Sequence, residues 1–149
     1  MGYTTDFEGR FKLNKSLDVE TFNKLQKLVS RGYEIESLFT WCQWIPSKDR
    51  KYIEWDGQEK FYGYIYWIKY IVNNILKPGG YELNGEVEWF GEDRKDIGKI
   101  SIINNKIKIM KLKWEFKEES PWQSCSEEFE KFNKINEVIS AFLNAKNID

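Results

Sequence analysis

The chain has 149 residues and no histidine, and its 23 Lys and Arg residues nearly balance its 24 Asp and Glu residues. The length suits one domain with its own core, and the balanced charge excludes a global field that would attract nucleic acid or an anionic membrane. Without histidine, Ser-His-Asp and Cys-His catalysis and most zinc and non-haem iron sites are excluded, so a binding protein is favoured over an enzyme.

The cysteine content and the hydropathy indicate the cellular compartment. Cys42 and Cys125 are too few and too isolated for a disulfide framework, and no zinc-ligand spacing is present. The first residues, MGYTTDFEG, lack the basic and apolar regions of a secretory signal, and no stretch approaches the roughly 18 apolar residues of a membrane span. We therefore expect a soluble, cytoplasmic protein with no membrane contact and no cofactor.

The first element is a strand predicted over Tyr3 to Leu13, where apolar and polar residues alternate. Gly9 lies at one of the apolar positions and indicates a bulge or a close approach of another backbone. Asp18 suits a helix N-cap, and the apolar positions after it keep helical spacing until Arg31 and Gly32, which would end the helix. We expect this helix to lie on the sheet.

The middle of the chain combines a predicted hairpin with a second helix. Residues 38–45 (LFTWCQWI) and 51–55 are rich in β-prone side chains, and residues 46–49 (PSKD) form a turn sequence between them. The apolar positions from Tyr62 to Leu76 predict a long helix that KPGG at 77–80 ends. Because aromatic side chains ring its first turns, we expect this helix to be buried on more than one side.

Residues 81–113 predict the centre of the fold, because they contain consecutive strands together with their turns. Val87 and Trp89 alternate with glutamates as on a half-buried strand, and GEDRKD then supplies a turn before the next strand. Asn104 and Asn105 suit the positive backbone dihedrals of a tight hairpin. These strands are expected to form an antiparallel meander.

The last of these strands changes which of its faces is apolar. Its apolar positions move from Ile107 and Ile109 to Met110 and Leu112. Because successive side chains of a strand point to opposite faces, this change indicates a bulge, or a crossing to a second packing surface, near residues 109–110.

The C-terminal region is predicted to be a linker followed by a helix. Residues 117–123 are polar with one proline, and Ser124 with Glu127 forms a capping-box pattern before a long apolar stripe. We expect this helix to dock on the core, and exchange between the protomers of a homodimer stays open. The predicted organisation is an α+β core (1–116) with an antiparallel sheet of five or six strands and two helices on one face, the linker, and a helical extension (124–149).

Three stretches resemble a family of small, uncharacterised proteins of bacteria and their phages. They are MGYTTDFEGRF (1–11), WCQWIPSKDRKYIEWDGQEKFYGYIYWIKYIV (41–72) and YELNGEVEWFGEDRKDIGKISI (81–102). They match the family motifs MGYTTDFxGxF, WCQWxP, IEWDGxEKFY and NGExxWxGED. The resemblance implies a shared fold and a phage or mobile-element origin, without a reaction. This chain departs from the family by a shorter segment before WCQW and by its additional terminal helix.

Acidic residues form the first candidate site. If the strands that contain Glu54 and Glu88 were neighbours, their carboxylates would converge into a magnesium site or an acid/base pair. The favoured alternative is a solvated strand face with turns at Asp56 and at Asp93, because neither stretch has a metal-loop spacing. The full set is Glu54, Asp56, Glu59, Glu86, Glu88, Glu92 and Asp93.

Aromatic residues form the second candidate site. Rings interleaved with Gln43 and Asp56 would suit a pocket for a nucleobase, a sugar or a peptide, since stacking contributes about 1–3 kcal/mol per base. Most of the rings are expected to fill the core, which leaves two or three to line a groove. The set is Trp41, Trp44, Trp55, Tyr62, Tyr66, Trp67 and Trp89.

The remaining charged run is basic. Lysines on an edge strand usually prevent aggregation, so we do not expect nucleic-acid binding by Lys106, Lys108, Lys111 and Lys113. The small side chain of Cys42 lies in an apolar strand and is expected to be buried.

Together these patterns predict a non-enzymatic protein, monomeric or homodimeric, that binds a protein partner such as a host factor. The alternative is a binder of a small ligand (nucleotide or sugar), or a carboxylate-dependent, metal-assisted hydrolase. No residue is assigned a catalytic or metal-binding role. The candidate binding residues are Trp44, Trp55, Asp56, Glu59, Tyr62, Glu88, Glu92 and Asp93.

Overall fold

The structure, a computed structural model, describes residues 2–36, 41–112 and 122–124. Its centre is one antiparallel sheet in the order β2-β3-β1-β4-β5-β6-β7. The predicted α+β class is confirmed, and with the three-residue β7 the sheet has seven strands where five or six were predicted. The strands are β1 (Thr5–Leu13), β2 (Trp44–Pro46), β3 (Tyr52–Trp55), β4 (Leu83–Gly91), β5 (Ile97–Ile103), β6 (Lys106–Leu112) and β7 (Trp122–Ser124).

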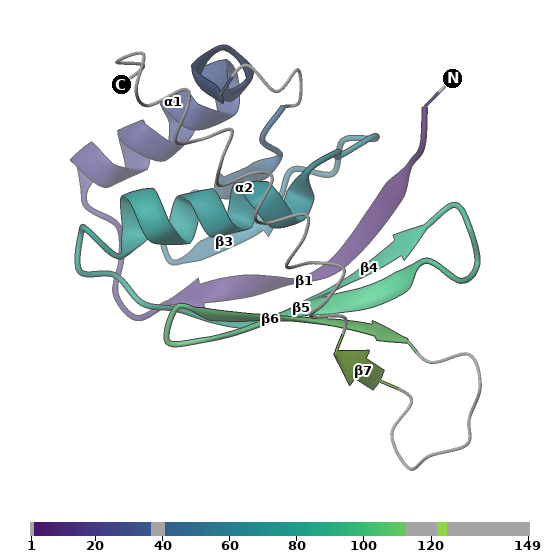
Figure 1. Ribbon diagram of the computed structural model, residues 1–149. Helices are drawn as coiled ribbons and strands as arrows, with labels where there is room; N and C mark the ends of the chain where they lie inside the picture. The colour runs from purple at the N-terminus through teal and green to yellow at the C-terminus, as the bar shows by residue number, and fades with distance from the viewer. Residues whose placement is uncertain (1, 37–40, 113–121, 125–149) are drawn as a thin grey trace.

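Two helices cover one face of the sheet, as predicted (Figure 1). One is α1 (Val19–Glu36), and the other is α2 (Tyr64–Ile71), which continues as the π-helix η1 (Val72–Leu76). α1 packs against β2 and η1, and α2 also contacts β2. The helices therefore lie mainly over the β2 end of the sheet, where the chain between β3 and α2 also lies.

The first helix begins where the sequence predicts and ends later. Thr21 N donates a hydrogen bond to Asp18 Oδ1 at 2.7 Å, so Asp18 is the N-cap. The end predicted at Arg31 and Gly32 is wrong, because α1 continues to Glu36. A glycine inside a helix costs only about 1 kcal/mol relative to alanine, and the residues after it continue the helix.

Aromatic rings fill the layer between the sheet and the helices. The centroid of the Phe7 ring lies 5.3 Å from that of Trp44 and 5.6 Å from that of Phe61. Tyr64 joins the cluster, with its ring 5.1 Å from Phe7 and 5.5 Å from Trp89. Such pairs contribute roughly 0.5–1.5 kcal/mol each beyond the burial of their area. Much of the aromatic excess is therefore core material.

Two local predictions about the backbone are confirmed. Gly9 has a φ of 98°, and a Cβ added to it would lie 2.5 Å from Glu86 O, so β1 and β4 approach too closely for a side chain there. Asn104 and Asn105 have φ values of 48° and 69° and form the tight turn between β5 and β6.

The bulge predicted near residues 109–110 is absent from the pairing of β5 with β6. Each residue from Lys106 to Lys111 has a single partner in β5, in unbroken register. Met110 and Leu112 therefore lie on the sheet face away from the helices, opposite to Ile109, and both are half-buried. The apolar positions of β6 therefore move from one sheet face to the other although the strand stays regular.

Other predicted segments are covered only in part. Of the strand predicted over 38–45, Trp44 and Ile45 belong to β2, and residues 37–40 lie outside the described residues. The helical extension predicted over 124–149 also lies outside them, except for Ser124, which ends β7. In the described part of the chain, no helix combines the length and apolar character required to span a membrane.

Candidate functional site

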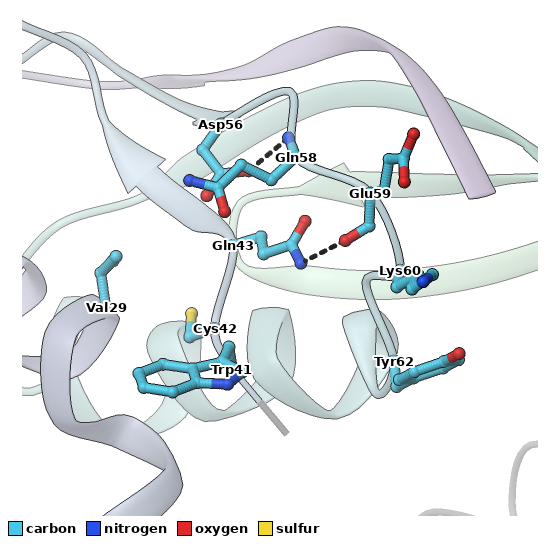
Figure 2. Close-up of a pocket in the computed structure, with 9 residues that line it drawn as sticks. All are labelled: Val29, Trp41, Cys42, Gln43, Asp56, Gln58, Glu59, Lys60 and Tyr62. Carbon is cyan, nitrogen blue, oxygen red and sulfur yellow. Dashed lines mark hydrogen bonds between the residues drawn. The ribbon is translucent and has the colours of Figure 1, made fainter. Parts of the chain in front are cut away.

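A pocket of about 560 Å³ lies between α1, residues 41–43 and the loop of residues 56–62 (Figure 2). Residues 41–43 lead into β2, and the 56–62 loop connects β3 to α2. The volume falls within the roughly 300–1,000 Å³ of typical small-molecule sites. The lining residues are Val29, Trp41, Cys42, Gln43, Asp56, Gln58, Glu59, Lys60 and Tyr62.

Gln43 holds the 56–62 loop against the segment that precedes β2. Its side chain is 7% exposed, and its Nε2 donates a hydrogen bond to Glu59 O at 3.0 Å, as Figure 2 shows. Its Oε1 accepts one from Trp55 Nε1 at 3.1 Å, and its backbone oxygen accepts one from Asp56 N at 3.0 Å. Because a buried amide bonded at both ends is costly to displace, these bonds keep one wall of the pocket in a fixed shape.

Asp56 supplies a carboxylate to this pocket. Gln58 N donates a hydrogen bond to Asp56 Oδ1 at 2.9 Å, which closes a turn and leaves lone pairs of Oδ2 for a ligand. Burial raises the pKa of the Asp56 carboxyl above its usual value, partly opposed by the hydrogen bond from Gln58. A bound cation or hydrogen-bond donor would offset this desolvation.

Two aromatic side chains lie across the pocket from Asp56. Trp41 is 53% exposed and Tyr62 is 43% exposed, unlike the rings of the core. Figure 2 shows both rings on one side, with Asp56 and Gln58 on the other and Gln43 between. The prediction that Tyr62 belongs to the helix is wrong, because α2 begins after Gly63, whose φ of 71° is left-handed.

The N-terminal segment fixes the position of Tyr62. Tyr3 N donates a hydrogen bond to the Tyr62 hydroxyl oxygen at 2.8 Å. The same segment is bonded to the turn between β4 and β5, where Thr4 N donates to Glu92 Oε1 at 2.7 Å and Asp93 N donates to the Tyr3 hydroxyl oxygen at 3.1 Å. Glu92 and Asp93 therefore stabilise this turn and anchor the N-terminus.

The backbone of residues 56–63 has a positive φ at three positions beside the pocket. Gly57, Lys60 and Gly63 have φ values of 84°, 61° and 71°. Glycine tolerates this region, but for lysine a left-handed conformation costs about 1–2 kcal/mol. Strain of this kind concentrates at binding sites, where the surrounding structure maintains it.

Four of the eight predicted site residues lie together at the pocket. Asp56, Glu59 and Tyr62 line it, and Trp55 supports it through the bond to Gln43. Trp44, in contrast, is fully buried in the core, where its Nε1 donates to Tyr64 O at 2.8 Å.

The two acidic stretches do not converge, because β1 lies between β3 and β4. Glu54 and Glu88 are therefore on strands that do not adjoin. Glu54 pairs with Arg10 at 3.4 Å, and Glu86 pairs with Lys99 at 3.5 Å, on the face away from the helices. This matches the solvated strand face that was the favoured alternative. Both pairs are partly exposed, and ion pairs near the surface stabilise a protein little.

The pocket lacks two kinds of reactive centre. Within the described ranges, no group of three His, Cys, Asp or Glu residues is placed to hold a metal ion. Cys42 is buried, and desolvation raises the pKa of its thiol to about 12, so the thiol stays protonated near neutral pH. The Cys42 side chain therefore lines the pocket as a buried, unreactive group, as its apolar context predicts.

The sequence-based choice missed residues that shape the pocket. Trp41 belonged to the aromatic set and Gln43 was a polar group interleaved with it, but neither was among the candidate binding residues. Nothing in the sequence marked Lys60 or Val29. Gln43 is the one polar residue in the motif WCQW, and a polar side chain in an apolar run is a sign that it satisfies a buried bond.

Comparisons of the chain with protein-family models, with curated proteins and with solved structures find no match. The function is therefore argued from the pocket.

Proposed function

We propose that this is a non-enzymatic binding protein whose recognition site is the pocket between Trp41 and Asp56. The observation that carries the proposal is a pre-shaped cavity of about 560 Å³ with exposed rings on one side and a partly buried carboxylate on the other. Such a combination of apolar surface with a few fixed polar groups is the general design of binding sites. Exposed Trp and Tyr side chains are also the usual anchors of protein interfaces.

The fixed geometry of the wall supports binding. Gln43 bonds to the 56–62 loop at two points, Asp56 and Glu59. A site that is ordered before its ligand arrives loses less conformational entropy on binding. The strain at Lys60 is consistent with a loop whose shape is maintained for recognition.

The chemistry of the pocket favours binding over catalysis. Its carboxylates come from Asp56 and Glu59, its thiol is protonated, and the sequence contains no histidine to serve as a base. Within the part of the chain that the structure describes, no group of three His, Cys, Asp or Glu residues is placed to hold a metal ion. A carboxylate-dependent, metal-assisted hydrolase is therefore the less favoured reading.

The resemblance to bacterial and phage proteins supports a mobile-element origin and a host protein as the partner, in the cytoplasm. A second candidate is a small ligand such as a nucleotide or a sugar. The volume of the pocket is compatible with it, because about 560 Å³ lies within the roughly 300–1,000 Å³ of typical small-molecule sites. Both candidates use the same cavity and differ in the occupant.

A ligand panel with a matched surface control tests the proposal. Nucleotides, monosaccharides and short peptides are screened by thermal shift, and hits are mapped by amide chemical shifts in the ¹⁵N-labelled protein. We expect the ligands that bind to shift the amide signals of Gln43, Asp56 and Gln58, and we expect Trp41→Ala to weaken their binding. Ile103→Ala, which truncates a side chain that is 65% exposed on β5, should leave the ligand affinities unchanged. Ligands whose shifts map only outside the pocket, or whose affinity is unchanged by Trp41→Ala, would contradict the proposal.

A further inference from the structure

The two sides of the pocket offer different chemistry to an occupant. Val29 and Trp41 present apolar and aromatic surface, and Asp56 presents a carboxylate across the cavity from Trp41 (Figure 2). An occupant that contacts both needs an apolar stem several atoms long and a polar head that donates hydrogen bonds. Long cationic side chains have this form, because they lay their methylenes on apolar surface and extend the charged head.

The charges of the lining favour a positive head. Of the lining residues that the structure describes, Asp56 and Glu59 are acidic and Lys60 is basic, which gives these residues a formal charge of −1. The Lys60 stem lies beside the N-terminal segment, since a Cβ built on Gly2 would come within 2.8 Å of Lys60 Cδ and 2.9 Å of its Cε. This contact draws the Lys60 side chain toward Gly2, so it does not neutralise Asp56.

The carboxylate of Asp56 is suited to a planar, multi-donor cation. Asp56 Oδ1 accepts a hydrogen bond from Gln58 N, and the remaining lone pairs of the carboxylate can accept further hydrogen bonds. A guanidinium group donates two parallel hydrogen bonds to a carboxylate, is less strongly hydrated than an ammonium group, and stacks on indole and phenol rings. Arginine therefore fits this pocket better than lysine does.

Resting on the binding function proposed above, we propose that the pocket receives an arginine side chain of a protein partner, with its guanidinium on Asp56 and its stem along Trp41. The exposed rim favours a protein as the source. Trp41 and Tyr62 are 53% and 43% exposed, and their outer surfaces are placed to contact the partner around the inserted side chain.

The test compares arginine with its neutral isostere. The ¹⁵N-labelled protein is titrated with the peptide acetyl-Gly-Arg-Gly-amide and with the same peptide containing citrulline, which keeps the shape and removes the charge. We expect the arginine peptide to shift the amides of Gln43, Asp56 and Gln58, and to bind at least about tenfold more tightly than the citrulline peptide. Asp56→Asn should abolish this preference, and Glu88→Gln, which removes a carboxylate of β4 away from the pocket, should preserve it. Overlay of the amide spectra shows whether each variant keeps the fold.

Each other result has a defined meaning. Equal binding of the two peptides at the pocket would overturn the preference for a cation while the binding function stands. Retention of the preference in Asp56→Asn would overturn the role given to that carboxylate. If free arginine bound as tightly as the peptide, the occupant would be a small molecule rather than a partner protein. If the ligand panel gave pocket hits but the arginine peptide did not bind, this inference alone would fail.

Discussion

Gln43 is the residue on which the shape of the pocket depends. Replacing it with alanine leaves Glu59 O without its donor, although Trp55 Nε1 keeps a second acceptor in Gln58 O at 3.2 Å. Because the hydrogen bond to Glu59 O is partly buried, and a typical intramolecular hydrogen bond contributes about 0.5–1.5 kcal/mol, we expect Gln43→Ala to lower the free energy of unfolding by that amount in urea titrations. Amide exchange should also accelerate in residues 56–62.

A second variant keeps one of the two side-chain hydrogen bonds of Gln43. Gln43→Glu retains an oxygen for Trp55 Nε1 but replaces the donor to Glu59 O with an acceptor, so it should destabilise the loop as well. An unchanged urea midpoint in both variants would show that Gln43 does not hold the loop.

Gly98 provides a test of packing at the residue scale. A Cβ added there would overlap the fully buried Trp89 indole and come within 2.6 Å of Met110 O. Overpacking of this kind costs about 1–3 kcal/mol, so Gly98→Ala should lower the urea midpoint clearly. Gly57→Ala is the matched control, because nothing lies within 4 Å of the added Cβ and only the φ of 84° opposes it. If Gly57→Ala were the more destabilising of the two, this account of Gly98 would be wrong.

At the scale of the element, α1 should make stability depend on pH through its cap. The hydrogen bond from Thr21 N is the main cause that lowers the pKa of Asp18. A lowered pKa in the folded state means that the carboxylate stabilises the fold above the ordinary aspartate pKa, and that this contribution disappears as the pH falls through the lowered value.

Asp18→Asn isolates this contribution, because asparagine also caps helices but carries no charge. Urea unfolding of both proteins from neutral to acidic pH should show the natural protein more stable at neutral pH, with the difference shrinking as the pH falls. A difference that stays constant with pH would contradict the assignment.

The short β7 and the predicted terminal helix can be separated by two truncations. Ending the chain after Ser124 removes residues 125–149 and keeps β7, whereas ending it after Glu118 also removes the pairing with Met110–Leu112. We expect both steps to lower the thermal midpoint, the first because the helix is predicted to cover apolar surface and the second because strand pairing is lost. If truncation after Ser124 left stability and oligomeric state unchanged, the docking prediction would be wrong.

At the scale of the whole molecule, local patterns predicted the elements better than their assembly. The hairpin at Asn104 and Asn105 and the cap at Asp18 were predictable because the physical cause lies within a few residues. The start of α2 was not predictable, because Tyr62 keeps the helical spacing and only the left-handed Gly63 shows that Tyr62 lies outside the helix. A residue's exposure also depends on its tertiary neighbours, which is why Trp44 appeared to be a site residue.

The site could be predicted only to the extent that its residues are close in sequence. Asp56, Glu59 and Tyr62 belong to one loop, and the motif around them marked it. The contribution of Val29 required knowing that α1 packs beside β2. The separation of Glu54 from Glu88 required the strand order, which places β1 between them and which sequence periodicity does not encode.

The central claim is that recognition takes place at the pocket and not on the charged face of the sheet. Hydrogen–deuterium exchange of the protein, alone and saturated with the ligand or partner that binds most tightly, measures this directly. The account predicts slower exchange on binding in residues 41–43 and 56–62, with β4 and β5 unchanged. Protection of β1, β4 and β5 without protection of the 56–62 loop would place recognition on the opposite face and would contradict the account.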